Sequence, residues 1–246
     1  MKKLLTLIIG VTISFFLNAQ NITLEKNNEG AWIKEDGEKV LFYQTRTKSM
    51  DGEYARANYF HPLYNVDGYE MTEDFPKDHL HHRGIFWTWH QTIMGEKHIG
   101  DAWECKEFIW DVIEFGTIKS SENSLTMQSK TLWKSPGWTD NNGTLKPFVK
   151  EIAEVTIHKK NTNFRIIDFK ISLLALEEDV KIGGSDNAKG YGGFSVRMKM
   201  PKDIKFNAAA GEVEPITNQI DAGSWMNISG TLAANGGEAV SYTHLT

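Results

Sequence analysis

Residues 150–174 read KEIAEVTIHKKNTNFRIIDFKISLL, and the spacing of their apolar side chains predicts the fold class. In the second half, Ile167, Phe169 and Ile171 alternate with polar residues and therefore share one face of an extended strand. Residues 150–158 supply the partner strand, and the polar residues 161–163 form the turn between them. The stretch predicts a long β-hairpin whose strands of about ten residues suit a large curved sheet.

The flanking sequence contains more strand-like runs. The pair Asp36-Gly37 between two apolar and aromatic runs is a strong hairpin signal. We find no convincing long amphipathic helix and no internal repeat. The sequence predicts a mainly β protein, an antiparallel β-sandwich of two packed sheets. The runs that predict strands, besides the long hairpin, are 22–26, 31–34, 39–43, 110–115 and 124–132.

Both ends of the chain have signals unrelated to the fold. Lys2 and Lys3, the apolar run 4–17 and the small residue Ala19 match a secretory signal peptide at residues 1–19, so we expect a periplasmic or secreted protein. The apolar run is shorter than the ~20 residues of a spanning helix. Residues 240–246 look like a non-native tail. We therefore expect one incomplete sandwich domain at residues 20–239, truncated at its C-terminus.

Charge and cysteine content exclude several classes of partner. The formal net charge is −5 and no basic run occurs, which argues against nucleic acid. No membrane span is expected after signal cleavage. Cys105 is the only cysteine, so no disulfide can form within the chain. The oligomeric state stays open.

The strongest functional signal is the run Asp78-His79-Leu80-His81-His82-Arg83. Imidazole, carboxylate and guanidinium groups move protons, bind metals or hold polar substrates, and packing alone does not explain such a density of them. In an extended segment, His79 and His81 would project to one face and His82 to the other. Arg83 would then hold a carboxylate or hydroxyl group of a substrate.

These residues predict a small-molecule or oligosaccharide ligand, with a histidine protonating a ring or glycosidic oxygen. A carboxylate such as Asp78, Glu104 or Glu151 would be its partner in acid–base chemistry. Trp103 and Tyr191 would offer flat faces to sugar rings, as Trp87 and Trp89 would if they did not pack in the core.

Two alternatives remain open at this point. His79 and His81 with Asp78 or Asp74 would suit a divalent metal such as non-haem iron, copper or manganese, although His61 or a loop would be needed to complete the set. The same aromatic residues would also suit a non-catalytic carbohydrate-binding domain with structural histidines.

Residues 183–193 contain five glycines and no Walker-type phosphate motif. This segment is either a long connection between strands or a loop that lets the backbone approach a ligand beside Tyr191.

Taken together, these elements resemble the bacterial family filed as PmoA, or methane oxygenase. The resemblance rests on His61-Pro-Leu-Tyr64, Asp78-His79-Leu80-His81-His82-Arg83-Gly84, Asp101-Ala-Trp103, Arg165-Ile-Ile-Asp-Phe169 and Gly190-Tyr191-Gly192-Gly193 with Arg197. It implies a supersandwich similar to galactose mutarotase and a place among sugar-acting proteins, with His61 and Arg197 joining Trp103 and Tyr191 as substrate-binding candidates. Literal methane oxidation by a membrane copper enzyme is not expected, because no spanning helix follows the signal peptide.

Overall fold

Strands, turns and loops account for the whole of the described structure, a computed structural model that covers residues 22–214, 216, 220–231 and 237–242. None of these residues lies in a helix. No helix in this part of the chain is therefore long and apolar enough to cross a membrane. The predicted signal peptide and residues 243–246 of the predicted tail lie outside the described residues.

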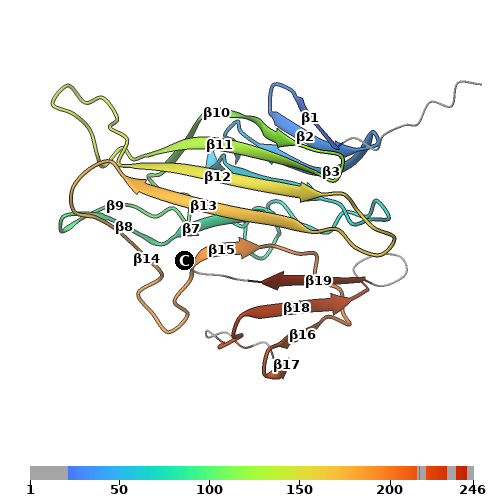
Figure 1. The fold of residues 1–246 in the computed structure, drawn as a ribbon. Helices are drawn as coiled ribbons and strands as arrows, with labels where there is room; N and C mark the ends of the chain where they lie inside the picture. The colour runs from blue at the N-terminus through green and yellow to red at the C-terminus, as the bar shows by residue number, and fades with distance from the viewer. Residues whose placement is uncertain (1–21, 215, 217–219, 232–236, 243–246) are drawn as a thin grey trace, which may run out of the picture.

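One layer of the fold is a six-stranded antiparallel sheet with the order β1-β2-β3-β6-β7-β15 (Figure 1). Its first three strands form a meander that contains the predicted hairpin, and Asp36 and Gly37 take the positive φ angles of 52° and 83° that a tight hairpin turn requires. The strands are β1 (Ile22–Lys26), β2 (Gly30–Glu35), β3 (Glu38–Gln44), β6 (Tyr59–Leu63), β7 (Ile85–Trp89) and β15 (Gly192–Val196).

The second layer is a four-stranded antiparallel sheet with the order β10-β11-β12-β13. The predicted long hairpin is confirmed as β12 and β13, with Val155 opposite Phe169. Ile167, Phe169, Ile171 and Leu173 are half-buried while the residues between them are exposed, as the alternation predicted. The strands are β10 (Ile109–Ser120), β11 (Ser124–Lys134), β12 (Val149–His158) and β13 (Ile167–Ala175).

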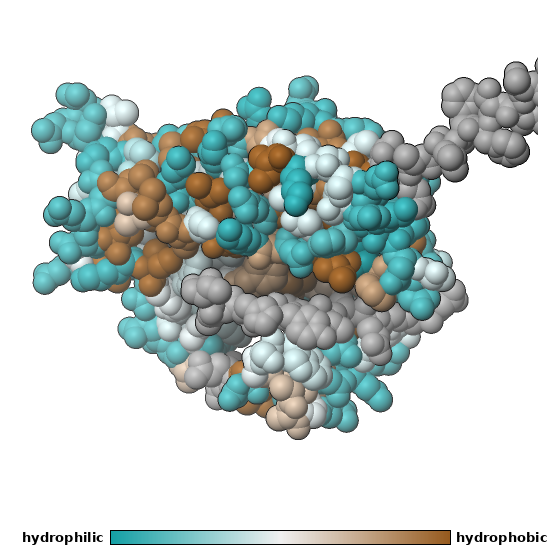
Figure 2. Space-filling view, viewed as in Figure 1, coloured by the Kyte–Doolittle hydropathy of each residue, from teal (hydrophilic) through white to brown (hydrophobic). Residues whose placement is uncertain are grey.

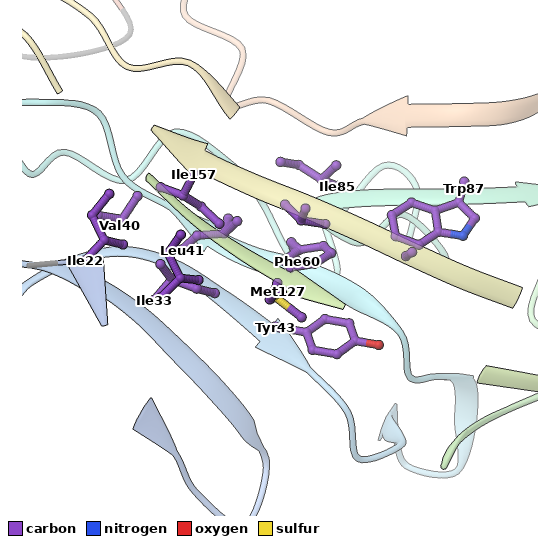
Figure 3. Packing of buried hydrophobic residues seen from close by; sticks show 13 residues of the cluster. Ile22, Ile33, Val40, Leu41, Tyr43, Phe60, Ile85, Trp87, Met127 and Ile157 are labelled. Atoms are coloured by element: carbon purple, nitrogen blue, oxygen red, sulfur yellow. The ribbon is translucent and has the colours of Figure 1, made fainter. Parts of the chain in front are cut away.

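The core lies between these two sheets. Ile33, Leu41 and Phe60 from the six-stranded sheet meet Met127 and Ile157 from the four-stranded sheet (Figure 3). Burial of each such side chain contributes roughly 1.5–3 kcal/mol. The prediction of a mainly β, antiparallel sandwich is therefore confirmed.

Three smaller sheets extend the sandwich. β14 (Val180–Gly183), β8 (Gln91–Met94) and β9 (Lys97–Gly100) form one of them, and β4 (Lys48–Met50) pairs with β5 (Glu53–Arg56). The third of these smaller sheets has the order β17-β16-β18-β19 and lies below β15 in the view of Figure 1. Its strands are β16 (Lys205–Ala208), β17 (Gly211–Val213), β18 (Trp225–Gly230) and β19 (Gly237–Tyr242), so the backbone of residues 240–242 pairs within it.

Apolar side chains gather at the surface over the C-terminal end of β13 (Figure 2). Leu174 is 60% exposed and Leu176 is 41% exposed. Within the described residues, β13 is the last strand of its sheet, so this apolar surface borders an edge that has no paired strand.

A carboxylate is buried between the two main sheets. Glu151 on β12 has no exposed surface, and its two carboxylate oxygens accept hydrogen bonds from Nδ2 of Asn58 and Nε1 of Trp133, each at 2.8 Å. The hydroxyl of Tyr43 in turn donates to Oδ1 of Asn58 at 2.7 Å. Burial raises the pKa of Glu151 despite these donors. This position corrects the expectation that Glu151 is an acid–base partner of the histidines.

The raised pKa of Glu151 predicts a pH-dependent stability. The folded state holds the proton more tightly than the unfolded state, so the free energy of unfolding should fall as the pH rises above about 4.3, the ordinary glutamate pKa. Glu151→Gln should remove this decline with pH, even if the substitution also changes the free energy of unfolding by an amount that is the same at every pH. Urea unfolding from pH 4 to pH 8 measures it, with Glu154→Gln on the outward face of the same strand as the control. An unchanged pH dependence in Glu151→Gln would contradict the assignment.

Candidate functional site

The histidine run forms a tight turn that two backbone hydrogen bonds stabilise. The N–H of His79 donates to the carbonyl of Pro76 at 3.0 Å, and the N–H of His82 donates to the carbonyl of His79 at 2.9 Å. The turn leads directly into β7, which belongs to the six-stranded sheet. The expectation of an extended segment is therefore wrong for these residues.

The turn brings all three imidazole rings together. The rings of His79 and His82 stack with their centroids 4.8 Å apart and an interplanar angle of 12°. His81 meets His82 edge-on at 4.5 Å and lies 5.9 Å from His79. The separation of His82 onto an opposite face, expected for a strand, does not occur because the backbone reverses here.

Trp103 lies at the centre of a larger group of rings. His82 contacts it edge-on at 5.6 Å, and His81 lies 6.3 Å from it. Tyr191 stacks on Trp103 at 5.3 Å with an interplanar angle of 17°. His90 is also near-parallel to Trp103, at 5.5 Å. The structure thus joins the predicted pair Trp103 and Tyr191 to the histidine turn.

A buried arginine holds the Trp103 segment in place. Nη2 of Arg56 donates to the carbonyl oxygen of Ala102 at 2.7 Å and lies 3.3 Å from that of Trp103. Its guanidinium carbon lies 4.3 Å from the ring centroid of Trp110, in cation–π geometry. Nothing in the sequence around Arg56 indicated this role, because its partners are 46 or more residues away.

The glycine-rich segment, residues 183–193, places Tyr191 beside Trp103. The side-chain amide of Gln91 donates to the carbonyl of Gly184 at 2.8 Å, which fastens the loop to β8. The N–H of Ser185 donates to the carbonyl of Tyr191 at 2.9 Å and closes the loop. The segment thus connects β14 to β15 and places Tyr191 beside Trp103, and the approach of its backbone to a ligand stays a prediction.

Burial keeps two of the histidines uncharged near neutral pH. It lowers the pKa of His82 to about 3, with further lowering from the neighbouring His81 and His79. Burial also lowers the pKa of His81, although Glu104 opposes this effect. Nε2 of His82 is buried and has no hydrogen-bond partner among the described residues. His81 and His82 therefore present neutral nitrogens.

Two carboxylates border the rings. Oε1 of Glu104 lies 3.8 Å from Nε2 of His81, which is longer than a hydrogen bond but within ion-pair range. Oδ2 of Asp78 lies 3.0 Å from Nδ1 of His79, and Oδ1 of Asp78 accepts from Nη2 of Arg197 at 2.6 Å. The hydrogen bond with His79, followed by that from Arg197, lowers the pKa of Asp78.

Arg197 joins the histidine turn to the end of β15. Besides Asp78, its guanidinium contacts Glu73, with Nε 3.0 Å from Oε2. The predicted substrate-binding residue is therefore at the edge of the site, and two carboxylates of the protein already hold it.

Arg83 does not face this site. Its side chain has no exposed surface, Nη2 donates to the carbonyl of Lys48 at 2.6 Å, and its guanidinium carbon lies 3.4 Å from the ring centroid of Phe75. Nε lies 3.3 Å from Oδ1 of Asp74. These contacts give Arg83 a structural role and correct the expectation that it holds a substrate.

His61 lies apart from the three histidines. Its Nδ1 is 3.0 Å from Oγ1 of Thr72, and burial lowers its pKa. It lines a cavity of about 500 Å³ together with Asp78 and Lys199, on the flank of the loop that precedes the histidine turn. Asp78 is thus the residue shared by the cavity and the imidazole group.

The remaining tryptophans of the run are core residues: Trp87 packs in the sandwich and Trp89 against Trp133.

The metal alternative finds no support in the geometry. Within the described part of the chain, no three His, Cys, Asp or Glu side chains are placed to hold a metal ion. This includes the predicted set of His79, His81 and Asp78.

Fold and site together define a β-sandwich protein with a histidine turn packed against an aromatic platform. Residues 31–244 match the family of unknown function DUF6807, and the chain belongs to this family. Comparison with curated proteins and with solved structures found no match.

The lowered pKa of His82 predicts that its ring stays neutral through the physiological range. In histidine NMR titrations, the ring signals of His82 should not move between pH 8 and pH 5. Because the unfolded state gains the proton first, the contribution of His82 to stability should decline as the pH falls from about 6.5 toward 3. A midpoint for His82 above pH 6 would contradict its burial.

Gly84, which ends the turn, should not tolerate a side chain. Its φ is 45°, and a Cβ atom there would overlap the carbonyl oxygen of Phe60 and lie 2.7 Å from Cβ of His61. We expect Gly84→Ala to lower the free energy of unfolding by about 3 kcal/mol or more. Gly143→Ala is the matched control: its φ is 80° with no atom within 4 Å of the new Cβ, so it should cost only about 1 kcal/mol. If denaturant unfolding shows the same loss of unfolding free energy in both variants, the close packing at Gly84 does not restrict this position.

Proposed function

We propose that the protein acts on saccharides at the histidine turn. The observation that supports this proposal is the contact between an aromatic platform, Trp103 with Tyr191, and the neutral imidazoles of His81 and His82. Aromatic faces suit the apolar faces of sugar rings, and a few placed polar groups give such a site its orientation and specificity.

The chemistry proposed is proton transfer to and from hydroxyl or ring oxygens. A neutral imidazole accepts a proton near pH 7 and the imidazolium so formed can return it, and Nε2 of His81 lies 3.8 Å from Oε1 of its carboxylate partner Glu104. Tyr191 is 39% exposed whereas Trp103 is 7% exposed, so a ligand would reach this pair of rings from the side of Tyr191.

The proposal agrees with the resemblance to the exported PmoA family and to the galactose mutarotase supersandwich, both of which stay predictions. Export through the signal peptide also stays a prediction. A non-catalytic carbohydrate-binding role would use the same platform, and a metal-dependent enzyme would use the same histidines, so the experiment must separate all three.

The test combines binding and turnover with a panel of free aldoses, oligosaccharides and p-nitrophenyl glycosides, followed by calorimetry and by NMR of the products. His81→Ala should lower turnover by about 100-fold or more and leave binding within a few-fold, because an acid–base group contributes mainly to the chemical step. His98→Ala, an exposed histidine on β9, is the control and should change neither.

Other outcomes of this experiment favour the alternatives. Binding without any product would favour the non-catalytic domain, and loss of turnover after chelation would favour the metal enzyme. The absence of binding by any saccharide at millimolar concentration would overturn the proposal.

A further inference from the structure

Another imidazole–carboxylate pair comes from residues between the histidine turn and Trp103 in the sequence. His90 separates β7 from β8, and its Nδ1 lies 3.0 Å from Oδ2 of Asp101. We propose that His90, oriented by Asp101, is the proton acceptor of the saccharide site. The saccharide substrate in this inference rests on the proposed function. The tautomer of the His90 imidazole does not depend on it.

Asp101 is held on both of its carboxylate oxygens. While Oδ2 faces His90, Oδ1 accepts the N–H of Glu104 at 3.0 Å. Two backbone hydrogen bonds of 2.9 Å between Asp101 and Lys106 close the turn that carries Trp103 and Glu104. Rotation of the carboxylate away from His90 would break the hydrogen bond from the N–H of Glu104.

This arrangement selects one tautomer of His90. A carboxylate offers only lone pairs, so the nitrogen that faces it must carry the hydrogen. Nδ1 of His90 is then a donor to Asp101, and Nε2 of the neutral ring keeps a free lone pair. Asp101 is a positioning residue, and His90 is the group that would contact the substrate.

Contacts with the Trp103 segment also fix the plane and the position of the His90 imidazole. The ring lies near-parallel to Trp103, with centroids 5.5 Å apart and an interplanar angle of 22°. The N–H of Trp103 donates to the carbonyl of Trp89, the residue before His90, at 3.1 Å. The His90 side chain retains 19% of its surface exposed, so solvent and ligand can reach it.

The proton step balances with the groups present. A hydroxyl group of a saccharide on the Trp103 platform transfers its proton to Nε2 of His90, whose lone pair forms the new N–H bond. The products are an alkoxide oxygen on the saccharide and an imidazolium whose Nδ1–H stays bonded to Asp101. The ring centroid of His81 lies 6.3 Å from that of Trp103, so a second neutral imidazole borders the same indole and can accept a proton.

The chain contains a matched control for this pair. His158 on β12 and Asp168 on β13 form a similar contact, with Nε2 2.7 Å from Oδ2, on the exposed face of the four-stranded sheet. Asp168→Asn thus removes an imidazole–carboxylate pair that has no part in the proposed site.

The experiment measures the rate at which diethyl pyrocarbonate modifies each histidine, mapped by peptide mass spectrometry, in the full chain. This reagent attacks an unprotonated imidazole nitrogen. Asp101→Asn should slow modification of His90 by about tenfold, because the amide can donate to Nδ1 and favour the tautomer with a hydrogen on Nε2. Modification of His98 should not change. An unaltered rate at His90 would overturn the inference, whether or not a saccharide substrate has been found.

Turnover in the same variants provides the second measurement. With any saccharide that the panel shows to react, Asp101→Asn should lower kcat by about 100-fold with little change in KM, while Asp168→Asn leaves both unchanged. Melting temperatures of the two variants separate a loss of folding from a loss of function. Equal turnover in Asp101→Asn and Asp168→Asn would overturn the role of His90. A panel without any reaction would count against the proposed function alone, since the modification rates do not depend on it.

Discussion

The close backbone packing at Gly84 is the constraint on which the candidate site depends. Its N–H donates to the carbonyl of Glu73 and its carbonyl accepts the N–H of Arg197, both at 2.7 Å, so three distant segments meet at one residue. A side chain would collide with the carbonyl of Phe60 in the neighbouring strand. Only with this contact in place can the chain turn tightly through the histidines and still enter β7 in register with Phe60.

Near the indole ring of Trp103, the site combines titratable groups whose surroundings differ. His82 is buried and neutral, whereas His79 lies at the surface with Asp78 as its partner. His90 is held by a carboxylate that a backbone turn fixes in place. Such differences between neighbouring titratable groups are typical of sites that transfer protons. The platform formed by Trp103 and Tyr191 would set where a ligand lies relative to them.

The sequence predicted the fold better than the site, for physical reasons. Alternation along residues 167–173 and the Asp36-Gly37 turn are local signals, and the structure confirms both hairpins. The path of the histidine turn depends on Gly84 packing against Phe60, a long-range contact that no local pattern reports. Arg83 illustrates the same limit, because its burial against Lys48 and Phe75 is decided by tertiary structure. His90 and Asp101 were visible only as residue types, and their pairing required the fold.

The most direct test of this account is a saccharide titration of protein labelled with ¹³C on the histidine rings, followed by NMR. We expect the ring signals of His81, His79 and His90 to shift together with one affinity, because His81 and His90 lie beside Trp103 and His79 lies beside His81. Signals of His98 and His158 should stay in place. Shifts confined to those two outlying histidines, or to His61 in its separate cavity, would contradict the assignment of the ligand site to the histidine turn.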